Sequence, residues 1–221
     1  MIIVIDGPAG SGKSSSARAI ANRLNIQFLD SGALYRAVTW HWVQSQKPDF
    51  ETFFKKLPET ELLTEYKDQT FFVSVNNKDI TAEIRKHNVA KHVSKIASQP
   101  KIRDFVNNYM RELVKEDVYV ADGRDLGTAV FPNAELKFYM EASIKERAKR
   151  RFKELQQSDP GVTLQQVKEN LEQRDHSDQT RAADPLKKAD DAIVIDTTGK
   201  TFEEQIEEMI LIIEEQLKLK H

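Results

Sequence analysis

One motif constrains the fold of this chain more than any other, the stretch Gly7-Pro8-Ala9-Gly10-Ser11-Gly12-Lys13-Ser14. It fits the pattern G-x-x-x-x-G-K-[ST] and lies between an apolar run, Ile2 to Asp6, and a helix-like stretch, Lys13 to Leu24. Glycines let the backbone curl with its N–H groups pointing inward, and the start of the helix adds a positive dipole. A strand, such a loop and a helix form a phosphate-binding loop, or P-loop, so the sequence predicts binding of ATP or GTP.

The polar residues of the P-loop have predicted tasks. Lys13 is expected to reach the β and γ phosphates and to act in catalysis, and the Ser14 hydroxyl is expected to ligate Mg²⁺, which prefers hard oxygen ligands. A glycine-rich turn without a ligand is the alternative, and the register of Gly, Lys and Ser argues against it. The residues expected to bind the nucleotide are Gly7, Pro8, Ala9, Gly10, Ser11, Gly12, Lys13, Ser14 and Ser15.

The composition narrows the functional classes. The 221 residues include 33 Lys plus Arg and 35 Asp plus Glu, so the net charge of -2 provides no general attraction to nucleic acid or to an anionic membrane. There is no cysteine, which excludes thiol nucleophiles, disulfides and Cys-ligated zinc, and the five His show no metal-binding spacing. The apolar opening is far shorter than a signal-peptide core or a membrane span, so we expect a cytoplasmic protein.

Short apolar runs alternate with helix-like stretches along most of the chain. Each run is nearly continuous, which is typical of a strand that is buried on both faces. The alternation predicts an α/β protein whose parallel sheet is flanked by helices. The predicted strands are Ile2 to Asp6, Ile26 to Leu29, Val118 to Asp122, Leu136 to Met140 and Ala192 to Asp196, and the predicted helices are Lys13 to Leu24, Ser143 to Leu155 and Phe202 to Leu217.

Residues 44 to 110 interrupt this alternation. Phe71 to Val75 and Ile80 flank a turn-forming Asn-Asn-Lys-Asp sequence and predict a β-hairpin, while the polar sequence around the hairpin is typical of helices. We therefore expect a small inserted subdomain. A second interruption, the polar turn Gln156 to Gly161, is typical of the tip of a mobile lid. A chain of this length is expected to form one core with such insertions.

Two further polar motifs directly follow predicted strands. They are Asp30-Ser31-Gly32-Ala33-Leu34-Tyr35-Arg36 after the second strand and Asp122-Gly123-Arg124-Asp125-Leu126-Gly127-Thr128 after the third. The carboxyl ends of parallel strands meet at one edge of a sheet, where the P-loop also lies, so the three loops are expected to converge. Their arginines could bind a second anion, as phosphoryl transfer to a small acceptor requires. In the alternative, Arg124 and Asp125 only cap a helix or pair with each other.

Four blocks of sequence together match one known family. They are Ile5-Asp6-Gly7-Pro8, Asp30 to Arg36, Asp122 to Pro132, and Arg174-Asp175-His176-Ser177-Asp178-Gln179-Thr180-Arg181. In these blocks the chain resembles the bacterial cytidylate kinase family, in that family's order and over the whole chain. The resemblance implies a P-loop nucleoside monophosphate (NMP) kinase fold, with a five-stranded parallel sheet flanked by helices, an inserted NMP-binding subdomain and a short lid. We expect a single domain, 1–221, with its core at 1–36, 111–146 and 166–221, the insertion at 37–110 and the lid at 147–165.

The resemblance also implies roles for individual residues. Arg36, Arg124 and Arg181 would hold the CMP phosphate, Arg174 and Asp178 the ribose, and Ser94, Arg103 and Asp125 the cytosine edge, with Ser31 as a further substrate-binding residue. The i, i+4 and i+7 spacing of Arg174, Asp178 and Arg181 places the three on one helix face. Arg147 and Arg151, together with Arg150, fall in the lid, where they would neutralise the transferring phosphoryl group, and a solvated basic helix face is the alternative. The expected catalytic residues are Lys13, Arg124, Arg181, Arg147 and Arg151.

These observations predict in-line transfer of the γ-phosphoryl group from MgATP to CMP, and also to dCMP, in pyrimidine nucleotide metabolism. Asp125 suits the exocyclic amine of cytosine, whereas uracil would place a carbonyl oxygen against its carboxylate. A kinase for another small acceptor such as UMP, and a non-catalytic nucleotide-binding module, stay open. A GTPase is disfavoured, because the nearest approach to N-K-x-D, residues 76–79, has the wrong order. The expected partners are small-molecule nucleotides, with neither nucleic acid nor a membrane, and the chain is expected to be a monomer.

Overall fold

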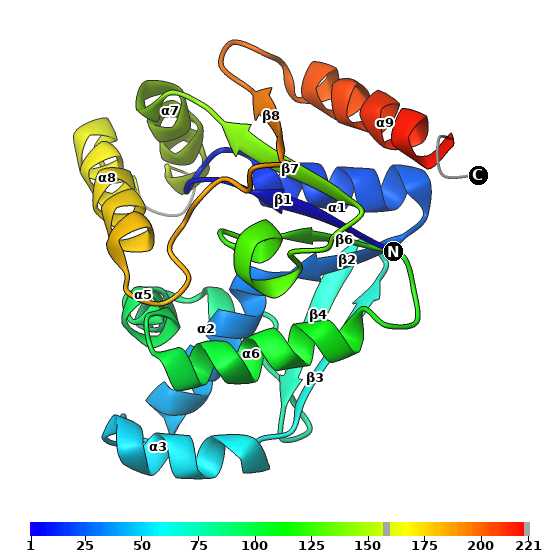
Figure 1. Ribbon diagram of the computed structural model, residues 1–221. Coiled ribbons are helices and arrows are strands. Elements are labelled where there is room, and N and C mark those ends of the chain that lie inside the picture. The colour runs from blue at the N-terminus through cyan, green and yellow to red at the C-terminus, as the bar shows by residue number, and fades with distance from the viewer. Residues whose placement is uncertain (157–159, 219–221) are drawn as a thin grey trace.

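A computed structural model describes residues 1–156 and 160–218 of the chain. The described part is built around a five-stranded parallel sheet with the order β2-β6-β1-β7-β8 (Figure 1). Its strands are β1 Ile2–Asp6, β2 Gln27–Asp30, β6 Tyr119–Asp122, β7 Leu136–Glu141 and β8 Ile193–Asp196. All neighbouring strands of this sheet are parallel, so the predicted α/β class and its five strands are confirmed.

Strand β1 lies at the centre of the sheet and fixes the position of the P-loop. All five of its residues are buried, as the continuous apolar run predicts for a strand covered on both faces. Val4 pairs with Ala121 of β6 on one side and with Lys137 of β7 on the other. The P-loop therefore leaves the sheet between two neighbours at the carboxyl edge, where open α/β sheets bind ligands.

Helices cover this sheet and extend away from it. They are α1 Lys13–Leu24, α2 Ser31–Gln44, α3 Phe50–Lys56, α4 His87–Ala90, α5 Val93–Ala97, α6 Pro100–Leu113, α7 Ile144–Leu155, α8 Leu164–Thr180 and α9 Phe202–Lys218. Helix α1 packs against β6, and α9 packs against α1. Figure 1 shows α7 and α8 side by side, across the sheet from the N-terminus. Short helical turns are η1 Leu57–Glu59, η2 Glu83–Arg85 and the π-helical η3 Leu126–Val130.

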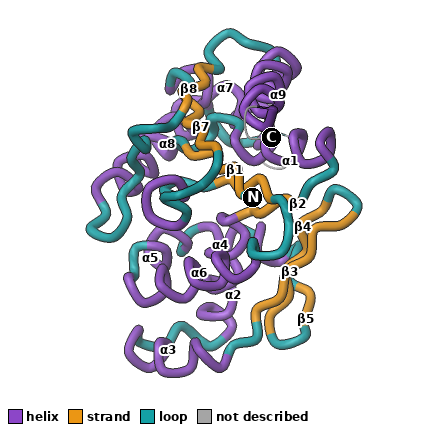
Figure 2. The backbone as a smooth tube through the Cα atoms, turned by 45° about the vertical axis from the view of Figure 1, so that its right-hand side comes forward, coloured by secondary structure: helices purple, strands orange, loops and turns teal. Residues whose placement is uncertain are grey.

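A three-stranded antiparallel sheet forms part of the predicted insertion. Its strands are β3 Leu62–Lys67, β4 Thr70–Val75 and β5 Lys78–Asp79, and Figure 2 shows them beside α2 and α6. The pairing of Val75 with Lys78 confirms the predicted hairpin. The prediction of helical sequence around it is wrong at β3, which pairs with β4 along its whole length. The side chains of Leu62, Thr64 and Tyr66 alternate toward the interior, as a strand with one buried face requires.

The two sheets share one hydrophobic core. Ile3 of β1, Phe28 of β2, Phe71 of β4 and Ile213 of α9 all belong to it, and the rings of Phe28 and Phe71 meet edge to face at 6.0 Å. The insertion 37–110 runs from α2 into α6, and its boundaries stay a prediction. Part of the predicted lid, residues 157–159, lies outside the described residues, as does much of its predicted tip. None of the helices in the described residues has the length and apolar character needed to cross a bilayer.

Candidate active site

The P-loop backbone adopts conformations that only glycine takes without strain. Gly7 has φ 146° and Gly12 has φ 97°, and Gly12 caps the first turn of α1. A Cβ atom on Gly7 would lie 2.2 Å from the carbonyl oxygen of Met140, so the loop passes directly over β7. These two glycines fold the chain so that the amino-terminal end of α1 faces the loop, which is a favourable position for a phosphate group.

Lys13 is held inside the loop that it follows. Its residue is only 4% exposed, and its Nζ donates a hydrogen bond to the carbonyl oxygen of Pro8 at 2.7 Å and a longer one to the Ser11 hydroxyl at 3.4 Å. Burial lowers the pKa of Lys13 well below its usual value, and the neighbouring positive charge of Arg124 adds to this effect. A negatively charged phosphate in the loop would favour the charged form of Lys13, so this ammonium is well placed to bind a phosphate oxygen.

Ser14 and Asp122 supply the oxygens that a magnesium ion would need. The Ser14 hydroxyl donates to Asp122 Oδ2 at 2.6 Å, while Asp122 Oδ1 is buried without a hydrogen-bond partner among the described residues. Burial raises the pKa of Asp122 to about 6, and the negative charge of Asp30 adds to it. The described residues hold no cluster of three or more His, Cys, Asp or Glu side chains placed for a metal. The Ser14 hydroxyl and the unpartnered Oδ1 of Asp122 are hard oxygen donors, the kind of group that Mg²⁺ prefers alongside waters and substrate phosphates.

A cavity of about 580 Å³ lies next to the P-loop, and we call it the donor cavity. Gly10, Gly12, Lys13, Ser14 and Ser15 form part of its lining. The segment that follows β8 contributes Lys200, Phe202 and Gln205. This arrangement leaves room for a nucleotide whose phosphates reach the P-loop.

A second cavity of about 660 Å³, the acceptor cavity, adjoins the first. Its lining includes Ser94 on α5 and Ser177 on α8. Among the described residues, those that line both cavities are all arginines: Arg36, Arg85, Arg151 and Arg174. The boundary between the two cavities is therefore the most positively charged part of the site, which is where a group carrying several negative charges would be bound from both sides.

Arg36 and Arg174 are partly buried, and their guanidinium groups are free to bind an anion. Neither makes a side-chain hydrogen bond within the residues that the structure describes. Burial lowers the pKa of Arg174 to about 10, and the positive charges of Arg124 and Arg36 lower it further. Burial lowers the pKa of Arg36 as well. Buried cations without a paired carboxylate are costly, so this site is built for a negatively charged ligand.

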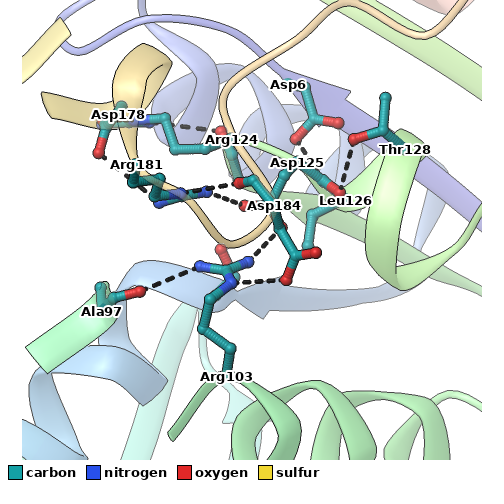
Figure 3. A network of polar contacts seen from close by, with 12 residues as sticks. Asp6, Ala97, Arg103, Arg124, Asp125, Leu126, Thr128, Asp178, Arg181 and Asp184 are labelled. Carbon is teal, nitrogen blue, oxygen red and sulfur yellow. Dashed lines mark hydrogen bonds and ion pairs between the residues drawn. The ribbon is translucent and has the colours of Figure 1, made fainter. Parts of the chain in front are cut away.

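A buried network of arginines and aspartates joins the loop after β6 to the end of α8 (Figure 3). Asp125 accepts one hydrogen bond from Arg103 and one, at 2.6 Å, from Arg181. Arg124 donates through Nε to Asp178 at 2.9 Å. The residues that the sequence predicted for this site therefore do lie together. Within the described residues, however, Arg103 and Arg181 are both paired with Asp125, and none of the three lines the acceptor cavity. Burial raises the pKa of Asp125, and the two arginines oppose this rise.

The expected helix face of Arg174, Asp178 and Arg181 is only partly correct. Helix α8 ends at Thr180, and Arg181 already has an extended backbone with φ -61° and ψ 142°. Its side chain reaches back to the helix, with Nη1 3.7 Å from Asp178 Oδ1. The turn after α8 moves Arg181 off the helix face and toward Asp125, because Leu186 closes the turn with a hydrogen bond to the Asp178 carbonyl oxygen.

The three arginines of α7 have different surroundings. Arg147 is buried and contacts the P-loop, with Nη1 donating to the carbonyl oxygen of Ala9 at 2.8 Å and to Asp175 at 2.6 Å. It is absent from the described lining of both cavities. Arg150 lines the donor cavity and donates to Thr197, whereas Arg151 lines both cavities and is half exposed beside Glu154. The geometry therefore favours Arg151 as the arginine that would contact a phosphate. It favours a structural role for Arg147, which holds the P-loop through Ala9.

Two predicted substrate-binding serines have contrasting positions. The buried Ser31 hydroxyl donates to the Asp122 carbonyl oxygen at 2.6 Å and so holds β2 and β6 together at their carboxyl ends. Ser94 is exposed and lines the acceptor cavity. His176 is also exposed. Ser94 therefore lines the acceptor cavity, whereas the Ser31 hydroxyl is already used by a backbone contact.

Several residues of the site escaped the sequence reasoning. Arg85 lines both cavities and pairs with Asp30 at 3.1 Å, but its segment carries no motif. Asp175 accepts from the Ala9 amide at 3.1 Å and pairs with Arg147. Asp6 accepts from the amides of Leu126 and Gly127, and so joins the P-loop to the loop that carries Asp125. For Asp6, its position between a strand and the P-loop is a signal that could have indicated a role in the site.

Known proteins resemble this chain in family and in fold. The family model described as cytidylate kinase matches residues 3–215. Among solved structures, an uncharacterized protein from Eubacterium ventriosum aligns with a TM-score of 0.54 at 13% sequence identity, and the alignment covers 97% of this chain and 98% of that chain. A shikimate kinase from Bacteroides thetaiotaomicron aligns with a TM-score of 0.47 at 15% identity, covering 99% and 98%. The family match spans nearly the whole chain, and the first of these structures has a similar fold.

Proposed function

Because this chain belongs to the cytidylate kinase family of P-loop NMP kinases, we propose that it transfers the γ-phosphoryl group of ATP to CMP, and also to dCMP. The products are ADP and CDP or dCDP, and the reaction belongs to pyrimidine nucleotide metabolism in the cytoplasm. The observation that carries the proposal is the set of four arginines that line both cavities. Catalysis of phosphoryl transfer consists mainly of positioning and charge neutralisation, which this arrangement supplies.

The proposed mechanism is a single in-line displacement. An oxygen of the CMP phosphate, ionised near neutral pH, attacks the γ phosphorus while the bond to the β-phosphate oxygen breaks, so no general base is required. Lys13 binds the β and γ phosphates, Arg36, Arg124 and Arg181 hold the CMP phosphate close to them, and Arg174 with Asp178 holds the ribose. Arg151 adds positive charge at the transferring group.

A magnesium ion is part of this proposal. Ser14 would ligate it directly, and the free Oδ1 of Asp122 would accept a hydrogen bond from one of its waters. When bound, the ion supplies charge neutralisation on the triphosphate. The residues of the chain orient the two nucleotides and exclude water between them.

Asp125 supports cytosine as the base of the acceptor. Its residue is only 4% exposed, so its carboxylate is not available to bulk water. The exocyclic amine of cytosine can donate to it, whereas uracil would place a carbonyl oxygen at the same position, at a cost of about 1 to 3 kcal/mol. Arg103 donates a hydrogen bond to the carbonyl oxygen of Ala97, on the same short helix α5 as Ser94, and these two residues complete the proposed base site.

The test is a coupled assay of ADP release with CMP, dCMP, UMP, AMP and shikimate as acceptors. The proposal predicts that CMP and dCMP have the highest kcat/KM. Turnover confined to UMP or to another acceptor would refute the substrate, and nucleotide binding without acceptor-dependent ADP release would refute the kinase activity.

A further inference from the structure

Asp184 has no role in the reaction proposed so far, yet it contacts both arginines that bind Asp125. Its Oδ2 accepts a hydrogen bond from Arg103 Nε at 2.6 Å, and its backbone carbonyl oxygen accepts one from Arg181 Nε at 2.7 Å. Figure 3 shows Asp184 between the two guanidinium groups and beside Asp125. The side chains of Arg103, Asp125 and Arg181 are almost fully buried, whereas that of Asp184 is 34% exposed, so Asp184 closes this network on the side of the solvent.

The two arginines use the same pair of nitrogens in the same way. In each, Nε donates to Asp184 and Nη2 donates to Asp125. Nε and Nη2 form the planar fork that binds a single carboxylate through two parallel hydrogen bonds when nothing else competes. In this protein each fork is divided between two acceptors. Asp125 therefore receives one hydrogen bond from each arginine instead of two.

This division determines what remains available on Asp125. An ionised carboxylate has about four acceptor positions, and two forks closed on Asp125 would occupy all of them. With the forks divided, about half of these positions stay free for a donor on a ligand. The exocyclic amine of the acceptor base is such a donor.

We propose that Asp184 is a positioning residue for base recognition, which keeps Asp125 free to accept a hydrogen bond by holding the Nε groups of Arg103 and Arg181. This inference rests on the proposed function, because it assigns Asp125 to the cytosine amine. Without the Asp184 carboxylate, Arg103 Nε turns to Asp125 and closes the fork. Asp125 then loses acceptor capacity, and CMP loses its advantage over UMP.

The backbone at Asp184 offers variants that separate its two contacts. Asp184 has φ 45°, in the left-handed region that glycine and asparagine adopt most readily. Asp184→Gly therefore keeps the backbone and its carbonyl contact to Arg181 while it removes the carboxylate. Asp184→Asn also fits the backbone and restores an oxygen acceptor for Arg103, without the charge.

The experiment measures kcat and KM for CMP, UMP and ATP in the wild type and in both variants. For Asp184→Gly we expect KM for CMP to rise and kcat/KM for CMP to fall about tenfold, the loss of roughly one buried hydrogen bond. The KM for ATP and the kcat/KM for UMP should change less than about twofold, which a general loss of structure would not allow. Asp184→Asn should recover most of the CMP activity.

Two results would overturn the inference. One is an Asp184→Gly variant with the wild-type ratio of CMP to UMP, and the other is an equal loss on CMP, UMP and ATP that Asp184→Asn does not repair. Absence of CMP turnover in the wild type would instead refute the proposed function. In that case a crystal structure of Asp184→Gly decides the geometric part, since Arg103 Nε within hydrogen-bond distance of Asp125 supports the inference and an unmoved Arg103 refutes it.

Discussion

Asp6 offers a direct test of how burial acts on the strand that leads into the P-loop. This residue is 4% exposed, and its carboxylate accepts hydrogen bonds from Leu126 at 3.0 Å and from Gly127 at 2.7 Å. Those bonds favour the ionised form, but burial outweighs them and raises the pKa of Asp6 from 3.8 to about 6, with the charge of Asp125 adding to the rise. Asp6→Asn removes the titration and keeps the size and most of the shape of the side chain.

The size and sign of the effect follow from the two pKa values. Between pH 3.8 and about 6 the native state holds a proton that the unfolded state has released. The stability that Asp6 contributes is therefore fully present below pH 3.8 and is lost as the pH rises through 6. A gap of about 2 pH units corresponds to about 3 kcal/mol. The free energy of unfolding of the wild type, minus that of Asp6→Asn, should fall by about this amount between pH 4 and pH 7.

Urea unfolding at a series of pH values measures this difference. Any constant cost of the asparagine amide cancels, because only the change with pH matters. Asp79→Asn is the matched control, since Asp79 is exposed and a hydrogen bond from the Thr81 backbone N–H lowers its pKa, so its difference curve should tilt in the opposite direction. A flat curve for Asp6→Asn, or one that rises with pH, would refute the reasoning.

Four further substitutions test the site. Lys13→Ala should abolish turnover and leave the far-ultraviolet circular dichroism spectrum unchanged; residual turnover above about 1% of wild type would contradict its role in phosphate binding. Arg181→Ala should lower kcat/KM for CMP by about ten- to a hundredfold and leave the KM for ATP nearly unchanged, and wild-type kinetics would remove Arg181 from the acceptor site. Arg147→Ala should lower the free energy of unfolding by about 1 to 3 kcal/mol, because it takes the charged partner from the partly buried Asp175, which keeps the hydrogen bond from the Ala9 amide. The ion pair of Arg151 with Glu154 is half exposed, so Arg151→Ala should change the free energy of unfolding by less than about 1 kcal/mol and should lower kcat. Urea unfolding and steady-state kinetics measure both. If Arg151→Ala lost stability and Arg147→Ala lost only kcat, Arg147 would be the phosphate-binding residue and Arg151 the structural one.

The large sheet was predictable because its strands carry their own signal. The strand at Ile2–Asp6 and the helix at Lys13–Leu24 have the predicted bounds, and the other strands of that sheet begin or end within one residue of the prediction. Strands buried on both faces need continuous apolar runs, which a sequence displays directly. Leu62–Lys67 has only every second residue turned inward, and its partner strand was needed to distinguish it from a polar helix.

The polar contacts of the site were less predictable than its location. Arg124, Asp125 and Arg181 could be selected from sequence blocks that follow strands or end a helix, whereas Arg103 came from the family resemblance alone. The four do gather in space. The carboxylate with which each arginine pairs could not be predicted in that way. Whether Arg147 faces a phosphate or Asp175 depends on how α7 and α8 pack. A guanidinium can pair with any carboxylate that lies near it, and the sequence does not say which one does.

The arginines that line both cavities have a consequence for the direction of the reaction. Transfer of one phosphoryl group from a triphosphate to a monophosphate yields two diphosphates, so the total number of phosphates in the site does not change. Arg36, Arg85, Arg151 and Arg174 border both halves and meet nearly the same total negative charge before and after transfer. Such a set of cations favours neither substrates nor products by charge alone. Bound reactants and bound products should therefore interconvert near equilibrium, and cellular concentrations rather than the protein would decide which way the phosphoryl group moves.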